Sequence, residues 1–230
     1  MNEIELDSWL EKISSWAQDE MAGSDSGHDI DHVRRVVTNA RSISASENAD
    51  LRIVLPAAWL HDCVNVPKNS PLRSQASRLA ASKASDFLRS ILFTEELIDP
   101  IAHCILAHSF SAGVPCESLE ARVVQDADRL EAVGAIGIAR CLMTGGAMRQ
   151  RLYHPDNPFP LDRKPEDTVQ SIDHFFSKLL RLDRTMQTES GRKLASQRTQ
   201  FMVDYLMQLS SELNIDQAVL EQSIQRVREC

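Results

Sequence analysis

Histidines and aspartates in the first third of the chain have the types and spacing of ligands for a divalent metal ion. His61 and Asp62 are adjacent at the end of an apolar run, and His28 and His32 lie four residues apart upstream. Imidazole nitrogens and carboxylate oxygens are common ligands of Mg²⁺ and of first-row transition metals. Asp62 also continues the apolar helical stripe that reaches Ala58. A carboxylate on a buried face is costly unless a cation meets it, which favours a metal site.

A second pair of carboxylates lies near the middle of the chain. Asp126 and Asp128 are two residues apart in the segment QDADRL. On a helix, side chains two residues apart point to nearly opposite sides. We therefore expect only one of these carboxylates to face a site shared with His61 and Asp62. Helical periodicity alone does not say which one.

Helices must position all of these residues, because strand signals are nearly absent from the sequence. Asp29 and Asp50 are suited to cap the helices that follow them, and Pro56 predicts a kink or a frayed start in the second of these. The segment 144–165 holds most of the remaining Gly and Pro and is predicted to be irregular. We expect an all-α fold, with helices over residues 3–21, 29–46, 50–62, 72–92, 95–110, 119–141 (in one or two pieces), 168–182, 189–213 and 216–227.

Length and composition narrow the classes of protein to consider. The 230 residues predict one helical domain, with a core over about 25–145 and a helical extension over about 146–230. Without an apolar run of about 18 residues, and with an acidic, mixed N-terminus, we expect no membrane segment and no signal peptide. The net charge of -8 argues against a stable nucleic-acid complex. The five cysteines are scattered without a CxxC pair, which predicts reduced thiols and a cytoplasmic location.

In combination, these motifs are similar to those of the HD-domain phosphohydrolase superfamily. The segment HDIDHVRRV at 28–36 matches the family's HDxxHxxRV, LHD at 60–62 matches its central motif, and ADRL at 127–130 matches its closing motif. Further segments, GAIGIAR at 134–140 and HFFSKLL at 174–180, resemble a bacterial subgroup of small single-domain HD hydrolases, some of which are nucleotide pyrophosphatases. The resemblance predicts an HD-domain helical bundle with additional C-terminal helices.

The resemblance implies that His32, His61, Asp62 and Asp128 are the metal ligands, and its ADRL motif selects Asp128 over Asp126. Two imidazoles and two carboxylates suit Mn²⁺, Mg²⁺, Fe²⁺, Co²⁺ or Ni²⁺, and Zn²⁺ is not excluded. Water activated by the metal would attack a phosphoester or phosphoanhydride bond. The expected substrate is a small phosphorylated molecule, a nucleotide such as a dNTP or NTP, and the expected activity includes (d)NTP pyrophosphatase.

Phosphate substrates need nearby cations, since negative charge develops on the phosphate oxygens during hydrolysis. The same residues could instead be solvated surface cations or packed histidines, so their roles stay open at this point. Besides Asp62, we consider Arg129, Lys68, His103 and His108 as catalytic residues. For substrate binding we consider Arg35, Lys68, Arg129, His108 and His154, with Arg149 beside His154 in the same irregular segment.

Other functions are compatible with the same motifs. The chain could be a nucleotide-binding sensor or regulatory HD module with little turnover, although retention of all four ligands argues against this. A two-iron oxygenase would need extra ligands, which only His103 and His108 could supply. Nothing in the sequence resembles a partner synthetase or a GGDEF or GYP motif, which argues against a two-headed alarmone enzyme and a cyclic-di-GMP phosphodiesterase. The amphipathic C-terminal helices are suited to pack on a second copy, so a homodimer is a further expectation.

Overall fold

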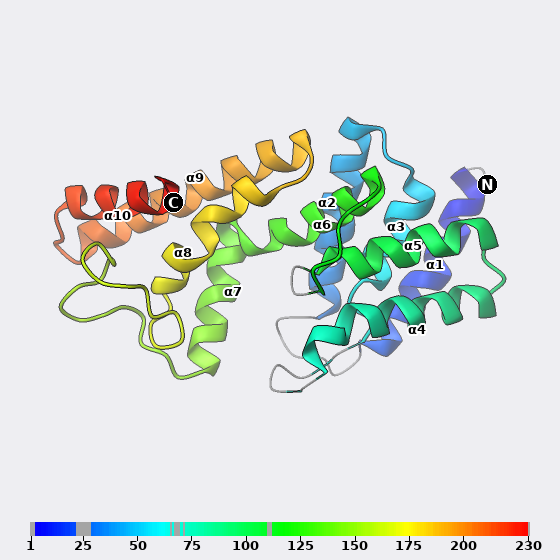
Figure 1. Ribbon diagram of the computed structural model, residues 1–230, viewed down its shortest axis with the longest axis horizontal. Helices are drawn as coiled ribbons and strands as arrows, with labels where there is room; N and C mark the ends of the chain where they lie inside the picture. Colours follow the sequence, from blue (N-terminus) through cyan, green and yellow to red (C-terminus); the bar gives the residue numbers. More distant parts are fainter. Residues whose placement is uncertain are drawn as a thin grey trace. The chain divides into compact units, whose positions relative to one another are not determined.

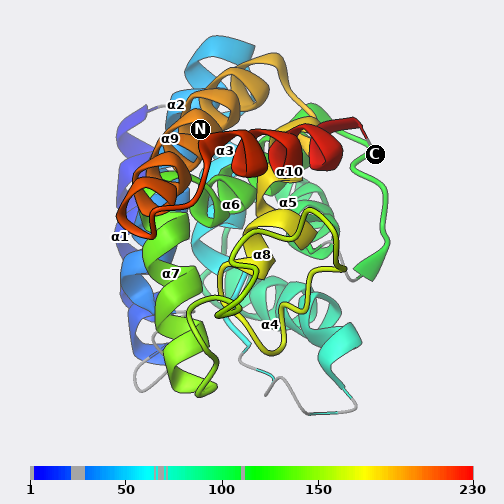
Figure 2. The same ribbon diagram turned by 90° about the vertical axis from the view of Figure 1, so that its left-hand side faces the viewer.

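The computed structural model describes residues 3–21, 29–64, 66, 70, 72–109 and 112–229 (Figure 1 and Figure 2). All regular secondary-structure elements in these residues are helices, which confirms the predicted all-α fold. An isolated β-bridge joins Arg151 and Gln170, and no strand forms around it in the described part of the chain.

The chain divides into two compact units. Unit 1 comprises Met1–Asp128 with Gln187–Gly191, and unit 2 comprises Arg129–Met186 with Arg192–Cys230. The division falls at 128/129, upstream of residue 145, where we expected the core to end. That the whole chain forms one domain stays a prediction.

Helix α3 (Leu51–Leu60) is the central element of unit 1. It packs against α1, α2, α4 and α5, and Val54, Leu55 and Leu60 on it are fully buried (Figure 1). Because this helix is surrounded, the residues that directly follow it start inside the unit. The other elements of unit 1 are α1 (Glu3–Glu20), α2 (Ile30–Glu47), the 3₁₀ turn η1 (Arg73–Gln75), α4 (Ala76–Ser90), α5 (Glu95–His108) and α6 (Leu119–Arg129), whose last residue belongs to unit 2.

Both predicted N-caps in unit 1 are confirmed. A side-chain oxygen of Asp29 accepts a hydrogen bond from the backbone N–H of His32, and one of Asp50 accepts from that of Arg52. Each cap satisfies a backbone donor that the first turn of a helix leaves without a partner. Pro56 lies inside α3, yet the helix begins at Leu51 directly after its cap, so the start is not frayed as one reading of Pro56 predicted.

Unit 2 begins at Arg129, and its first α-helix starts at Gly134. The segment 119–141, expected in one or two pieces, forms two helices, and Gly134 between them has a φ of +75° that favours glycine. The segment predicted to be irregular over 144–165 begins later than expected, because α7 continues to Ala147, and it is irregular from there to α8. An ion pair joins Arg163 in this segment to the buried Asp173 of α8. The elements are η3 (Leu130–Ala132), α7 (Gly134–Ala147), α8 (Asp173–Ser177), η4 (Leu179–Thr185), α9 (Glu189–Glu212, whose first residues lie in unit 1) and α10 (Gln217–Glu229).

No single helix among the described residues is long and apolar enough to cross a membrane. One pair, Leu119–Ala132 with Gly134–Ala147, passes the length and composition test together, but it is bent by 63°. Four of the five cysteines lie in the described part of the chain, and all four are free thiols.

Candidate metal centre

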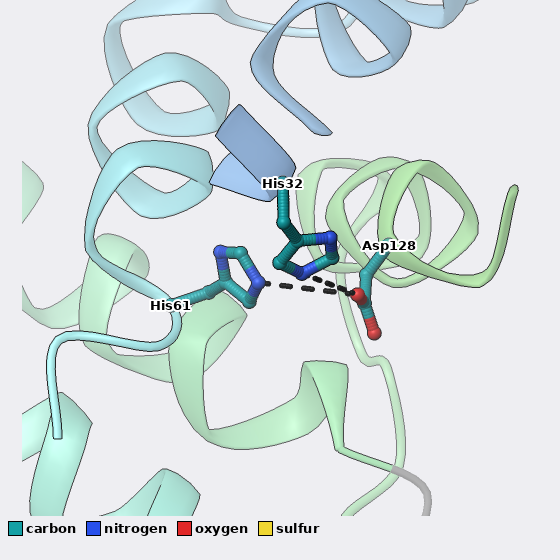
Figure 3. A group of neighbouring side chains, drawn as sticks. All are labelled: His32, His61 and Asp128. Carbon is teal, nitrogen blue, oxygen red and sulfur yellow. Dashed lines mark ion pairs between the residues drawn. The ribbon is translucent and has the colours of Figure 1, made fainter. Parts of the chain in front are cut away.

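The first turn of α2 directs His32 into unit 1. The backbone N–H of His32 is 2.8 Å from Oδ1 of the capping Asp29, which fixes the start of the helix. The His32 side chain is buried, as are Val33 and Val36 beside it on the same helix. A buried imidazole is costly unless its polar nitrogens have polar partners. The ring of His32 is directed toward His61, which follows α3 (Figure 3).

The end of α3 places His61 against the same space. Nδ1 of His61 lies 2.8 Å from the carbonyl oxygen of Ala58, so this nitrogen carries the proton of the neutral ring. The Nε2 atom then presents its lone pair to the interior. Nε2 is buried and has no hydrogen-bond partner among the described residues. A metal ion bound to this nitrogen would compensate for its burial.

Asp126 and Asp128 point to different partners, as their spacing on α6 predicted. Oδ1 of Asp128 lies 3.4 Å from Nε2 of His32 and 3.9 Å from Nε2 of His61. The fully buried Asp126 instead accepts hydrogen bonds from the backbone of Gln187 and Thr188. Of the two carboxylates, the structure therefore brings Asp128 to the histidines.

The four predicted ligands come together from three segments of the chain (Figure 3 shows three of them). Oδ2 of Asp62 lies 3.6 Å from Nε2 of His61 and 3.9 Å from Nε2 of His32. These separations, like those to Asp128, are longer than a well-formed hydrogen bond of about 2.9 Å. They match the spacing of about 3–4 Å between ligand atoms that each lie roughly 2.1 Å from one ion. The ligand atoms of His32, His61 and Asp128 all lie within 4.8 Å of one another, so this group could hold a divalent cation, with Asp62 beside it.

The electrostatics of the group favour the protonation states that a metal needs. Burial lowers the pKa of His61 below its ordinary value, and the attraction of Asp62 offsets this only in part. Burial raises the pKa of Asp128, but the imidazoles of His32, His61 and His108 outweigh it and hold that pKa well below its ordinary range. A neutral imidazole and an ionised carboxylate are the forms that bind metal ions.

His108 lies on the other side of Asp62 and shares the local design of His61. Its Nδ1 is 2.6 Å from the carbonyl oxygen of Ile105, three residues earlier, as Nδ1 of His61 is bonded to Ala58. Its Nε2 is 3.7 Å from Oδ1 of Asp62, and its ring is 5.0 Å from that of His61. Among the described residues, two potential metal-binding groups therefore share His61: one adds His32 and Asp128, and the other adds Asp62 and His108.

The other predicted site residues are placed differently. Nε2 of His103 accepts a hydrogen bond from the backbone of Glu117, outside both potential metal-binding groups. Arg129 and His154 belong to unit 2. There Arg129 donates to the carbonyl oxygen of Thr185, and Nδ1 of His154 accepts from the backbone of Asp156 and Asn157. Arg35 is half-buried on α2, and Lys68, like His28, lies outside the described residues.

Two buried polar residues around α6 were missed by the sequence analysis. Nδ2 of Asn39 on α2 donates to the carbonyl oxygen of Ala127, and Nε2 of Gln125 donates to that of Ala107 on α5. Both side chains are buried. A polar residue on an otherwise apolar helix face is the signal that could have found them.

Comparison with known proteins agrees with this site. The family model described as "HD domain" matches residues 29–133, a span that includes all four predicted metal ligands. The protein YpgQ of Bacillus subtilis (strain 168), described as uncharacterized, is 38% identical over 208 residues, which cover 88% of this chain and 93% of that protein. The chain belongs to the HD-domain hydrolase superfamily.

Solved structures give the same result for the fold. An HD-superfamily hydrolase from Bacillus thuringiensis has a TM-score of 0.73 at 33% identity, covering 92% of this chain and 100% of that one. The crystal structure of Bacillus subtilis YpgQ in complex with ADP has a TM-score of 0.71 at 35% identity, covering 90% of this chain and 96% of that one. The resemblance inferred from the motifs is thereby confirmed.

Proposed function

We propose that this hydrolase is a divalent-metal-dependent phosphohydrolase that cleaves phosphoester or phosphoanhydride bonds of nucleotides, with (d)NTP pyrophosphatase activity as the specific expectation. The observation that carries the proposal is the convergence of His32, His61, Asp62 and Asp128 from three segments, with both histidine Nε2 atoms 3.4–3.9 Å from an oxygen of each aspartate. The buried Nε2 of His61, without a hydrogen-bond partner among the described residues, supports a bound cation there.

The four residues would hold the ion, and each of Mn²⁺, Mg²⁺, Fe²⁺, Co²⁺, Ni²⁺ and Zn²⁺ is compatible with two nitrogens and two oxygens. When bound, such an ion supplies an activated water and polarises a phosphoryl oxygen. The backbone carbonyl of Ala58 keeps the His61 ring in the tautomer that leaves Nε2 free to bind. Four protein ligands leave positions on a six-coordinate ion for water and substrate.

His108 is suited to handle the proton of the leaving group. Its Nδ1–H donates to the carbonyl oxygen of Ile105, so His108 would act as an imidazolium: the second proton, on Nε2 beside Asp62, would pass to the departing phosphate oxygen and leave the neutral ring. Of the two histidines considered for this role, His103 is engaged with Glu117, which leaves His108 as our candidate. Arg35, Lys68, Arg129 and His154 stay candidates for binding the phosphates, by their positive charge or their hydrogen bonds.

The nucleotide part of the proposal is supported by a relative. Bacillus subtilis YpgQ has been crystallised in complex with ADP, and it covers most of this chain at 35% identity. The cytoplasmic location, the absence of a membrane or stable nucleic-acid partner, and a homodimer all stay predictions.

Release of phosphate and pyrophosphate should be measured over a panel of NTPs and dNTPs, metal by metal, with Asp62→Ala as the blank. We expect metal-dependent hydrolysis by the wild-type protein and none by the variant, whose circular dichroism should stay helical because Asp62 follows α3 rather than supporting it. Pyrophosphate as the product would establish the pyrophosphatase, and orthophosphate would indicate a phosphatase. Equal activity in both proteins would rule out the proposed centre.

The ADP complex of the relative also gives weight to the sensor function. A protein that holds a nucleotide without turning it over would show tight binding and negligible hydrolysis in the same panel. Equilibrium binding of each nucleotide, measured beside its hydrolysis, separates the two functions.

A further inference from the structure

The C-terminal turn of α6 is tied to three other elements through consecutive residues. Gln125 donates to the carbonyl oxygen of Ala107, the residue before His108, with a donor–acceptor distance of 2.8 Å. The carbonyl oxygen of Ala127 accepts from Asn39 of α2 at 3.3 Å. Asp126 binds the residues that begin α9, and Asp128 follows with its carboxylate toward His32. Each residue from 125 to 128 therefore makes a hydrogen bond or ion pair with another segment of unit 1.

Asp126 is the strongest of these anchors. Its Oδ1 accepts from the backbone N–H of Gln187 at 2.8 Å, and its Oδ2 accepts from the backbone N–H and the hydroxyl of Thr188 at 2.8 and 2.7 Å. The residue is fully buried. A buried carboxylate with three such bonds is stabilised in one orientation, because charge-assisted hydrogen bonds are short and directional.

The space around Asp126 is shaped to keep it there. A Cβ atom on Gly191 would lie 2.3 Å from Oδ2 of Asp126, so a glycine is needed at this position of the first turn of α9. A second carboxylate, that of Glu47 at the end of α2, accepts from the backbone N–H of Ser190 at 2.7 Å. Negative side chains are favourable at a helix N-terminus, where free N–H groups and the helix dipole meet them.

We propose that Asp126 is a positioning residue for the metal centre: by holding the start of α9, it fixes the α6 turn that aims Asp128 at the cation. This inference rests on the proposed metal-dependent function, and it assigns a role to the carboxylate that does not face the cation. Asp126 and Asp128 lie two residues apart on the same helical turn, so a shift of that turn moves the Asp128 carboxylate relative to His32 and His61. Residues that orient metal ligands typically contribute 10- to 100-fold, roughly, to metal affinity.

The test is metal affinity in Asp126→Asn, with Glu47→Gln as the matched control. The amide of Asp126→Asn keeps the size of the side chain but turns an NH₂ group toward a backbone N–H donor. Glu47→Gln makes the same change at a carboxylate that binds the same helix start but does not adjoin a predicted ligand. Mn²⁺ and Co²⁺ dissociation constants should be measured by calorimetry at a temperature where circular dichroism shows each protein folded, together with the visible spectrum of the Co²⁺ form.

We expect Asp126→Asn to raise the metal dissociation constant about 10- to 100-fold and to change the Co²⁺ spectrum, and Glu47→Gln to change neither beyond about twofold. Unchanged affinity and spectrum in Asp126→Asn would overturn the inference, as would an equal loss in Glu47→Gln, which would show a general effect of helix stability. Should Asp126→Asn fail to fold, Thr188→Val removes one bond to Oδ2 and should weaken metal binding in the same direction.

Hydrolysis assayed on the same samples separates this inference from the proposed function. A wild-type protein that binds the metal but hydrolyses no nucleotide would overturn the phosphohydrolase and leave the positioning role intact. A wild-type protein that hydrolyses nucleotides, beside an Asp126→Asn variant with unchanged metal affinity, would overturn only the positioning role.

Discussion

At the scale of single residues, neighbouring side chains of the same type have different partners: Asp128 lies beside His32 whereas Asp126 binds backbone N–H groups, and His108 lies beside Asp62 whereas His103 binds Glu117. The spacing of Asp126 and Asp128 predicted opposite directions, and the ADRL motif selected Asp128; the structure places Asp128 beside His32. The sequence could not choose between His103 and His108. That choice depends on the Glu117 backbone, which comes from a loop distant in sequence and occupies His103.

The two histidines of α5 provide a matched test of catalysis. His108→Gln should lower kcat by about 100-fold or more, since general acid catalysis contributes roughly 10²–10⁴-fold and Nε2 of His108 lies 3.7 Å from Asp62. His103→Gln should retain activity, because this ring supports a loop. Steady-state kinetics of both variants over a range of pH is the measurement. A larger loss of kcat in His103→Gln would reverse the assignment.

The buried thiol of Cys104 should be almost inert in the folded protein. Burial raises the pKa of Cys104 to about 12, and the thiolate is the form that reacts. At pH 8, a thiol with this pKa is ionised to roughly one part in 10⁴, so alkylation should be far slower than in the unfolded chain. Mass spectrometry of peptides after timed labelling, with and without urea, is the measurement. Rapid labelling of Cys104 in the native protein would contradict the burial.

At the scale of elements, helix caps were predictable because they depend on local residues. Asp29 and Asp50 cap the helices that they were expected to cap. The helix predicted over 168–182 was wrong in its first residues: the structure has α8 from Asp173 and then η4. The reason is not local, since the backbone N–H groups of Ser171 and Ile172 donate to the carbonyl oxygens at 151 and 152 instead of to a preceding turn.

The first turn of α9 should tolerate no side chain at Gly191. Alanine favours a helix over glycine by about 1 kcal/mol, yet a Cβ here would meet both Asp126 and Thr188. We expect Gly191→Ala to lower the free energy of unfolding by about 1–3 kcal/mol, as overpacking does. Gly146→Ala on α7 is the control, because nothing lies within 4 Å of its Cβ, and it should be neutral or stabilising. Urea unfolding of both variants is the measurement, and equal stability would contradict the predicted clash.

At the scale of the whole molecule, the sequence predicted the fold and the meeting of its motifs but not the division into units. The boundary at 128/129 lies one residue before the end of α6, inside the ADRL motif, where no change of composition marks it in the sequence. The return of Gln187–Gly191 to unit 1 depends on hydrogen bonds to Asp126 and Glu47, which are long-range contacts. All four predicted metal ligands nevertheless fall within unit 1, so the centre is complete in one unit.

Because the ligands are assembled only in the folded chain, a bound metal should stabilise the protein. With the metal at about 100 times its dissociation constant, binding contributes about 2.7 kcal/mol, which for a chain of this size raises Tm by about 5–10 °C. We expect this rise with Mn²⁺ or Co²⁺ relative to the chelator-treated protein, measured by thermal unfolding. Asp62→Ala should stay helical and lose the shift, whereas His154→Ala, in unit 2, should keep it. A wild-type Tm that is the same with metal and with chelator would mean that the four side chains do not bind a cation.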